Sequence, residues 1–148
     1  MAVRMDVEID GLAEMRARIR ALPRTAQVEL RDAAQAIADD EVVRIRRAAA
    51  GSSAQSARLA GFIRATRDRM PAISAGGNRR GGFSGGATAG QVFFGAEFGG
   101  EGRATTMQFR PHRGREGYFF FPTLREDQDR MLARYQQALA QIEREWAS

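Results

Sequence analysis

Few residues of this chain could carry out acid–base or nucleophilic chemistry, and the most suggestive stand in one stretch, QFRPHRGREGYFFFPTLRED, residues 108–127. This stretch contains the only histidine, His112, and Glu116 follows it four residues later. A catalytic histidine needs a nucleophile and an orienting acid within hydrogen-bond reach. Several serines stand in glycine-rich sequence, and none is flanked by the pattern of a nucleophile elbow. We therefore expect His112 to lie in solvent or at an interface.

Carboxylate pairs and metal ligands are the other chemistry that the sequence could offer. Glu97, Glu101 and Glu116 stand beside arginines, which would keep their carboxylates ionised, so we expect ion pairs there. The chain has no cysteine, one histidine, and only arginine among its 23 basic residues. This composition excludes thiolate nucleophiles, zinc–sulfur and multi-histidine sites, Schiff-base lysines and P-loop lysines. The sequence therefore predicts no catalytic residues, no metal and no cofactor, and an enzyme centred on His112 is the weakest hypothesis.

The charge of the chain permits two kinds of partner. A net charge of +5 and a pI of about 11.0 suit contact with nucleic acid or with acidic protein. The 18 acids are interspersed with the arginines, and no block of five like charges occurs. Arginine equally suits protein interfaces, because its planar fork pairs carboxylates and stacks on aromatic rings. We expect contact with protein and keep nucleic-acid binding as the alternative.

The aromatic residues of the same stretch could belong to a binding surface or to a core. Arginines and a histidine around Tyr118–Phe121 would suit base stacking. Three consecutive phenylalanines precede Pro122, however, as expected when their rings lie beneath a helix that begins there. We interpret residues 119–121 as core or subunit interface. A core does not explain the arginines, and a guanidinium cluster beside a glycine-rich arm suits a protein that docks onto others.

The first third of the chain predicts a strand and two helices within a single domain, residues 1–148. Alternating apolar residues predict a strand over 3–9, and helical spacing predicts a helix over 12–22. A long, alanine-rich helix is expected from about 25 to 50, with Gly51 as its C-terminal stop. No apolar run approaches the roughly 20 residues of a membrane helix. Acids replace the apolar core of a signal peptide, so folding in the cytoplasm is expected.

The middle of the chain predicts short strands and a mobile segment. Residues 62–69 predict a strand, and PAISAG, residues 71–76, either continues it or pairs with it. Residues 76–102 hold most of the 16 glycines, which predicts a flexible surface loop or an arm that becomes ordered only against a neighbour. Within this segment the apolar run at 91–94 predicts a strand. Residues 104–111 predict another.

The C-terminal segment carries the clearest helical pattern. YFFF is either a buried strand or the approach to a helix, and Pro122 is expected at the first helical position. Apolar residues at steps of three, four or seven predict an amphipathic helix that extends to Trp146. Its expected core residues are Phe120, Phe121, Leu124, Leu132, Tyr135 and Leu139. The expected fold class is α+β, with an N-terminal strand and short helix, a long helix, a small antiparallel sheet with the glycine-rich arm, and the C-terminal amphipathic helix packed on the sheet.

The order of these features resembles a known family. VFFGAEFGG, a polar insert, YFFFPTLRED and a terminal amphipathic helix are similar to the tailed-phage minor structural family called gene-product-ten-like. That family has a Glu-Phe-Gly-Thr-like turn, which Glu97, Phe98 and Gly99 match, with Gly100 in place of the threonine. The aromatic and proline segment that begins the family's last helix is similar to residues 120–124. DVEIDGL and the long helix agree with its N-terminal pattern, whereas its Thr-Gly-x-Leu element is present only as SARLAGFI.

The resemblance implies a non-enzymatic neck or tail-completion protein of the virion, assembled in the host cytoplasm. Such a subunit would form a ring, sixfold by analogy with the tail, and would contact a connector or stopper and a tail terminator or tail tube. Genomic DNA would pass through the ring without specific binding, and no membrane is involved. A tail terminator or stopper role in the same neck is the alternative. The residues expected at subunit contacts are Arg79, Arg80, Phe83, Glu97, Phe98, Arg103, Arg110, His112, Arg113, Arg115 and Glu116.

Overall fold

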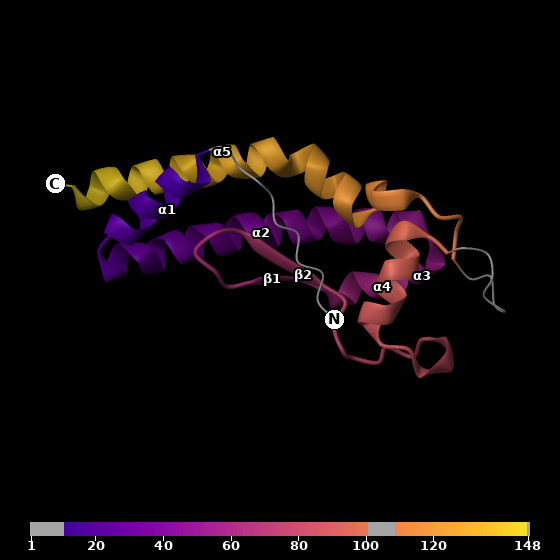
Figure 1. Cartoon of the computed structure of the whole chain (residues 1–148). Coiled ribbons are helices and arrows are strands. Elements are labelled where there is room, and N and C mark those ends of the chain that lie inside the picture. Colours follow the sequence, from indigo (N-terminus) through magenta and orange to yellow (C-terminus); the bar gives the residue numbers. More distant parts are fainter. Residues whose placement is uncertain (1–10, 101–108, 148) are drawn as a thin grey trace.

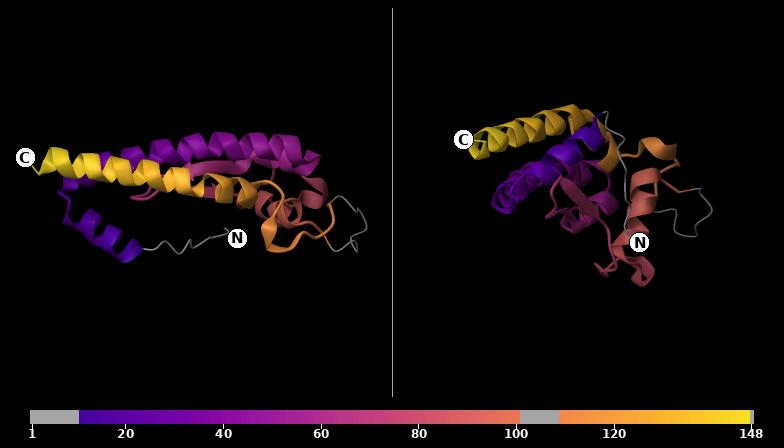
Figure 2. Two further views of the ribbon diagram at one scale, coloured as in Figure 1. Left: turned by 90° about the horizontal axis from the view of Figure 1, so that it is seen from above. Right: turned by 60° about the vertical axis from the view of Figure 1, so that its left-hand side comes forward.

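Two long antiparallel helices form the frame of the protein (Figure 1). The computed structural model describes residues 11–100 and 109–147, so the strand predicted at 3–9 lies outside the described residues. Helix α2, Arg24–Ser52, and helix α5, Phe120–Trp146, pack along each other. Figure 2 shows the same pair from two further directions, with the other elements gathered mainly toward the end where α2 stops and α5 begins. The long helix and the C-terminal helix are confirmed.

The short helix α1, Leu12–Ala21, packs at the opposite end and confirms the predicted helix there. Its Met15 and Ile19 join a buried cluster that also holds Leu30, Ile37, Tyr135, Leu139 and Ile142. Alanines of α2 lie in this cluster as well, because small side chains let helices approach closely. None of the helices in the described part of the chain has the length and apolar character that crossing a bilayer requires.

The predicted stop at Gly51 is wrong by two residues, because the helix ends where a side chain can cap the next one. Ser53 is extended, and its hydroxyl oxygen accepts a hydrogen bond from the Ser56 N–H at 3.1 Å. This bond caps helix α3, Ala54–Leu59, so the chain turns sharply between two helices. A cap with a defined partner therefore decides the boundary.

The sheet is a single antiparallel pair. Strand β1, Ile63–Thr66, pairs with strand β2, Ala72–Ala75, so PAISAG is the partner of the first strand. Arg46 of α2 donates from Nε and Nη2 to the Ile63 carbonyl oxygen at 3.0 and 2.7 Å, which fastens the sheet to the long helix. The small antiparallel sheet is confirmed.

The strand predicted at 91–94 is wrong, because these residues belong to helix α4, Ala89–Phe98. Thr88 and Gln91 form a reciprocal capping box, in which the Thr88 hydroxyl accepts from the Gln91 N–H at 3.3 Å and the Gln91 side chain accepts from the Thr88 N–H at 2.9 Å. The cap and tertiary packing outweigh the β-like appearance of the apolar run. The helix packs on α3 and fills the second half of the glycine-rich segment, whose flexibility stays a prediction.

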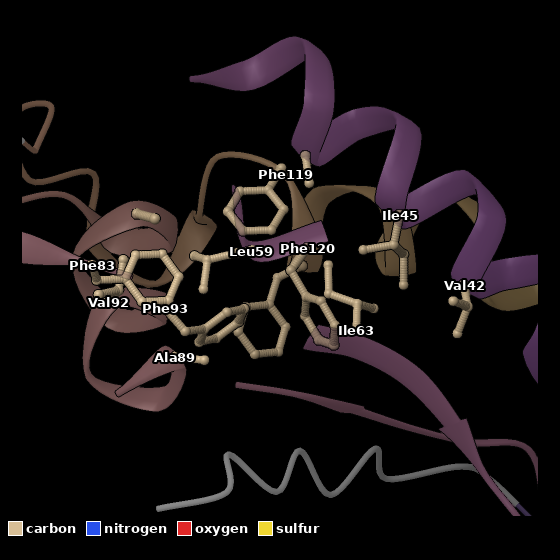
Figure 3. Packing of buried hydrophobic residues seen from close by; sticks show 13 residues of the cluster. Val42, Ile45, Leu59, Ile63, Phe83, Ala89, Val92, Phe93, Phe119 and Phe120 are labelled. Atoms are coloured by element: carbon tan, nitrogen blue, oxygen red, sulfur yellow. The ribbon is translucent and has the colours of Figure 1, made fainter. Parts of the chain in front are cut away.

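A second buried cluster joins α4, the sheet and the beginning of α5. Phe93 meets Phe120 edge-to-face, with ring centroids 5.4 Å apart, and Figure 3 shows both beside Ile63 of β1 and Leu59 of α3. The first turn of α5 therefore packs on the sheet, which confirms the α+β arrangement. Helix α5 begins at Phe120, so the prediction that Pro122 occupies its first position is wrong by two residues.

The predicted core residues of α5 differ in how deeply they are buried. Phe120, Phe121, Tyr135 and Leu139 are buried. Leu124 and Leu132 are half-buried. Leu124 packs against the cluster around Phe93 and Phe120, and Leu132 packs against the cluster that holds Met15 and Ile19. The aromatic run is thus core at its C-terminal end, as the position of the proline suggested.

Candidate interaction surface

The loop between α4 and α5 is fastened to the long helix by one arginine. Arg110 donates from Nη1 to the Ser52 carbonyl oxygen at 3.1 Å and from Nη2 to the Ser52 hydroxyl at 2.7 Å. Its guanidinium carbon lies 3.6 Å from the centre of the Tyr118 ring, and that of Arg113 lies 5.1 Å from the same centre. The Tyr118 hydroxyl donates to the Pro111 carbonyl at 2.7 Å. Hydrogen bonds and cation–π contacts therefore fix the shape of residues 110–118.

Backbone bonds join the same loop to the C-terminal end of α4. The Gly100 N–H donates to the Arg110 carbonyl and the Arg113 N–H donates to the Phe98 carbonyl, each at 2.8 Å. Phe98 is half-buried and stacks on Phe121 with ring centroids 5.6 Å apart. Phe94, one turn earlier in α4, is 41% exposed. Sequence reasoning missed Phe94, although a third aromatic beside two core phenylalanines in one helix could have indicated a surface position.

The exposed residues of this region form what we call the loop-end surface: Phe94, His112, Arg113, Arg115 and Glu116. The Arg113 Nε lies 3.9 Å from a Glu116 carboxylate oxygen, the outer limit of an ion pair, and the Glu116 side chain is 77% exposed. The Arg125 guanidinium donates to the Glu116 carbonyl oxygen and supports the turn Gly114–Glu116. His112 lies at the surface, which fits the prediction of a solvent or interface position. The surface therefore exposes cationic, acidic and aromatic side chains together.

Glu97 was predicted to contact a partner, but it is fully buried at 0% exposure. Its carboxylate accepts hydrogen bonds from the backbone N–H groups of Phe119, Phe120 and Phe121 at 3.2, 2.9 and 3.1 Å. These groups open α5, where unpaired N–H groups and the helix dipole favour a negative charge. Burial raises the pKa of the Glu97 carboxyl, while the backbone bonds act in the opposite direction. Glu97 therefore serves as a tertiary cap between α4 and α5, and its expected ion pair with arginine is also wrong.

Gly117 shows how closely the capping carboxylate approaches the loop. Its φ is +75°, in the region that favours glycine, and a Cβ atom there would overlap the Glu97 carboxylate. A glycine at this position lets the chain pass beneath Glu97 and enter the helix. The first turn of α5 and the loop-end surface thus depend on the same contact.

The remaining predicted contact residues divide into exposed and buried ones. Arg79 and Arg80 are exposed. Phe83 is only 5% exposed, so its predicted role at a subunit contact is wrong. The centre of its ring lies 5.9 Å from that of Phe62 and 5.5 Å from the guanidinium carbon of Arg58. Its ring fills a gap next to the sheet that the small residues around it leave open. Arg103 lies outside the described residues, as does Glu101.

A charged cluster that sequence reasoning missed lies between α2 and α5; we call it the buried charge cluster. Arg130 Nη2 lies 3.3 Å from Glu41 Oε2 and 3.4 Å from Asp127 Oδ1, and Arg44 Nη1 lies 3.3 Å from the same Asp127 oxygen. Glu41 is only 1% exposed, and neither its Oε1 nor Arg130 Nε has a hydrogen-bond partner among the described residues. An acid spaced four residues from both Ile37 and Ile45 was the available signal.

The environment of Glu41 favours its protonated form. Burial, a hydrogen bond shared with the Asp127 carboxyl and repulsion by that carboxyl raise the pKa of Glu41 to about 7, against the opposing attraction of Arg130 and Arg44. Two carboxyl groups therefore face the same Arg130 guanidinium at the contact of the two longest helices.

No family model, curated protein or solved structure matches the chain.

Proposed function

We propose that the chain is a structural subunit of the tailed-phage neck, which forms a ring and joins the tail to the head by docking onto neighbouring proteins. The observation that carries this proposal is the loop-end surface, where Phe94 is exposed on α4 and Arg113 and Arg115 are exposed on the anchored loop that follows it. Arginine and aromatic side chains are enriched at protein interfaces and supply much of their binding energy. The resemblance of the sequence to the neck and tail-completion family supplies the setting.

The anchoring of residues 110–118 favours a preformed docking surface over a segment that becomes ordered only on binding. Arg110 is held by Ser52 and stacks on Tyr118, so much of the loop's conformational entropy is lost on folding and not on binding. A surface of this kind would meet a different patch on the next copy, and such heterologous contacts close into a ring when the rotation allows it. Tail terminator and stopper are alternative positions for the same ring.

Charge reversal on the loop tests the proposal. Arg113→Glu with Arg115→Glu should abolish infectious particles in a phage that depends on this gene, while circular dichroism shows a folded subunit. Arg16→Glu with Arg144→Glu is the matched control, because these exposed arginines lie on α1 and on α5 and the change in net charge is the same. Normal particle yield from the loop variant would overturn the assignment.

A second candidate function, nucleic-acid binding, draws on the same exposed arginines and aromatic ring. It predicts that affinity for a DNA duplex falls steeply with salt, because each neutralised phosphate releases counterions. Titration of the purified chain with duplex at low and moderate salt separates the two candidates. Absence of binding at low salt would remove this one.

A further inference from the structure

A hollow of about 320 Å³ lies above the buried charge cluster, on the flank of the α2–α5 pair. Four arginines, one aspartate and one valine line it: Asp40, Val43, Arg44, Arg47, Arg130 and Arg134. Val43 is 50% exposed, the highest value among the exposed large apolar side chains of the described residues. The hollow therefore combines guanidinium groups from two helices with an uncovered apolar side chain.

The positive charge of the hollow is only partly neutralised by the chain itself. Arg134 pairs with Asp40 at 2.9 Å, and Arg44 and Arg130 share Asp127. Arg47 has no ion-pair or hydrogen-bond partner within residues 11–100 and 109–147, and the Arg130 Nε–H has no acceptor there either. Buried donors in native proteins almost always have a partner. Arg47 thus remains available for an anion, while the partly exposed Arg130 side chain lines the same hollow with its Nε buried and its Nη2 paired below.

The shape and lining of the hollow favour a protein carboxylate over a nucleic-acid backbone. Guanidinium forks match the two oxygens of a carboxylate, and an exposed valine suits the apolar part of a protein segment. Asp40 at the rim, with Glu41 and Asp127 below, would repel a continuous run of phosphates while tolerating a single acid. The residues that line the hollow belong to α2 and α5, whereas those of the loop-end surface belong to α4 and to the loop before α5.

We propose that this hollow docks an acidic side chain carried by a segment of another protein subunit. In a neck ring it would give each copy a second contact besides the loop-end surface, and in that respect the inference rests on the proposed function. An incoming carboxylate binds Arg47 and draws Arg130 toward itself and away from Glu41. Glu41 then retains its proton more firmly, so anion docking and proton uptake reinforce each other. The charged groups that face Glu41 are Asp127 and Arg130 of α5 and Arg44 of α2.

Binding of poly-L-glutamate to the purified full chain tests the inference without any requirement for ring assembly. Arg47→Glu with Arg134→Glu should weaken binding about tenfold or more, because the guanidinium that binds the carboxylate and a second one lining the hollow both become negative. The control Arg16→Glu with Arg144→Glu has the same net charge and should bind nearly as the native chain does. An equal loss in both variants would show that bulk charge attracts the peptide, and would overturn the proposal.

Two further measurements sharpen the result. A DNA duplex of equal charge should lose no more affinity in the hollow variant than in the control, and a loss confined to the hollow variant would identify a nucleic-acid site instead. Native affinity for poly-L-glutamate should rise as pH falls from about 8 to 6, while Glu41→Gln should abolish that rise. A pH dependence unchanged in Glu41→Gln would contradict the coupling. If Arg47→Glu with Arg134→Glu loses peptide binding while particles that carry it assemble normally, the hollow is not a contact of the ring. The neck assignment would stand in that case, because it depends on the loop-end surface.

Discussion

Glu97 and Glu41 are both buried glutamates that join a helix to α5, yet their surroundings are opposite. The carboxylate of Glu97 accepts three backbone N–H bonds at the start of the helix. That of Glu41 meets one guanidinium and a second carboxyl, and one of its oxygens has no partner among the described residues. Burial raises the pKa of both acids, but backbone N–H donors oppose that rise at Glu97, whereas the neighbouring carboxyl of Asp127 adds to it at Glu41.

Removal of the Glu97 carboxylate should produce the largest loss of stability. Glu97→Ala leaves three buried N–H groups without an acceptor, and each costs about 1–3 kcal/mol, so we expect the free energy of unfolding to fall by roughly 3 kcal/mol or more. Glu97→Gln keeps one acceptor oxygen and should lose less. Urea denaturation of both variants provides the measurement, and a loss in Glu97→Ala below about 1 kcal/mol would show that water replaces the cap.

The pH dependence of stability should report the protonation of Glu41. The pKa of Glu41 is about 7 in the folded chain, above its ordinary value of 4.5, so the folded state holds a proton that the unfolded state releases. The contribution of Glu41 to stability is therefore complete below about pH 4.5 and falls by roughly 3 kcal/mol as pH rises to about 7. Glu41→Gln should remove that part of the slope. The test measures the denaturation midpoints of the native chain and of Glu41→Gln across this pH range. Equal slopes of midpoint against pH in the two chains would contradict the expectation.

The contact between Glu97 and the loop can be tested with a pair of glycines. Gly117→Ala and Gly114→Ala both place an alanine at positive φ, +75° and +67°, but only the first would overlap the Glu97 carboxylate. Both should lose about 1–2 kcal/mol from backbone strain, and Gly117→Ala should lose at least about 1 kcal/mol more. Thermal or chemical denaturation of the two variants side by side gives the difference. Equal losses would mean that the carboxylate moves aside freely.

The anchoring of the loop should contribute the smallest effect on stability. Arg110→Ala removes two hydrogen bonds to Ser52 and the stack on Tyr118, all near the surface, so we expect a loss of about 1 kcal/mol. Faster amide hydrogen exchange at residues 110–118, with unchanged exchange in α1, would show that the loss is local. A loop whose exchange stays the same would contradict its anchoring by Arg110.

Periodic features of the sequence predicted most of the frame. Apolar spacing located α1, α2 and α5, and the runs at 62–69 and 71–76 located the two strands, although whether they pair was left open. Helix α4 was mistaken for a strand because its apolar run is short, although Thr88 and Gln91 stand at the spacing of a capping box. Prediction therefore succeeded where one element's own pattern sufficed.

The contacts that define the sites depend on residues far apart in the chain. Nothing near Glu97 indicates that residues 119–121 will supply its donors, and nothing near Arg110 points to Ser52. Glu41 stood at a buried spacing, but its partners on α5 become apparent only when the two helices are placed together. Local patterns cannot encode such pairings, because register and rotation of the helices are set by the whole core.

Electron microscopy of the purified chain tests the central claim most directly. Negatively stained native protein and the Arg16→Glu, Arg144→Glu control should form rings, whereas the Arg113→Glu, Arg115→Glu variant should remain as folded single subunits. Rings in all three samples, or in none, would contradict the role of the loop-end surface as the contact that builds the assembly.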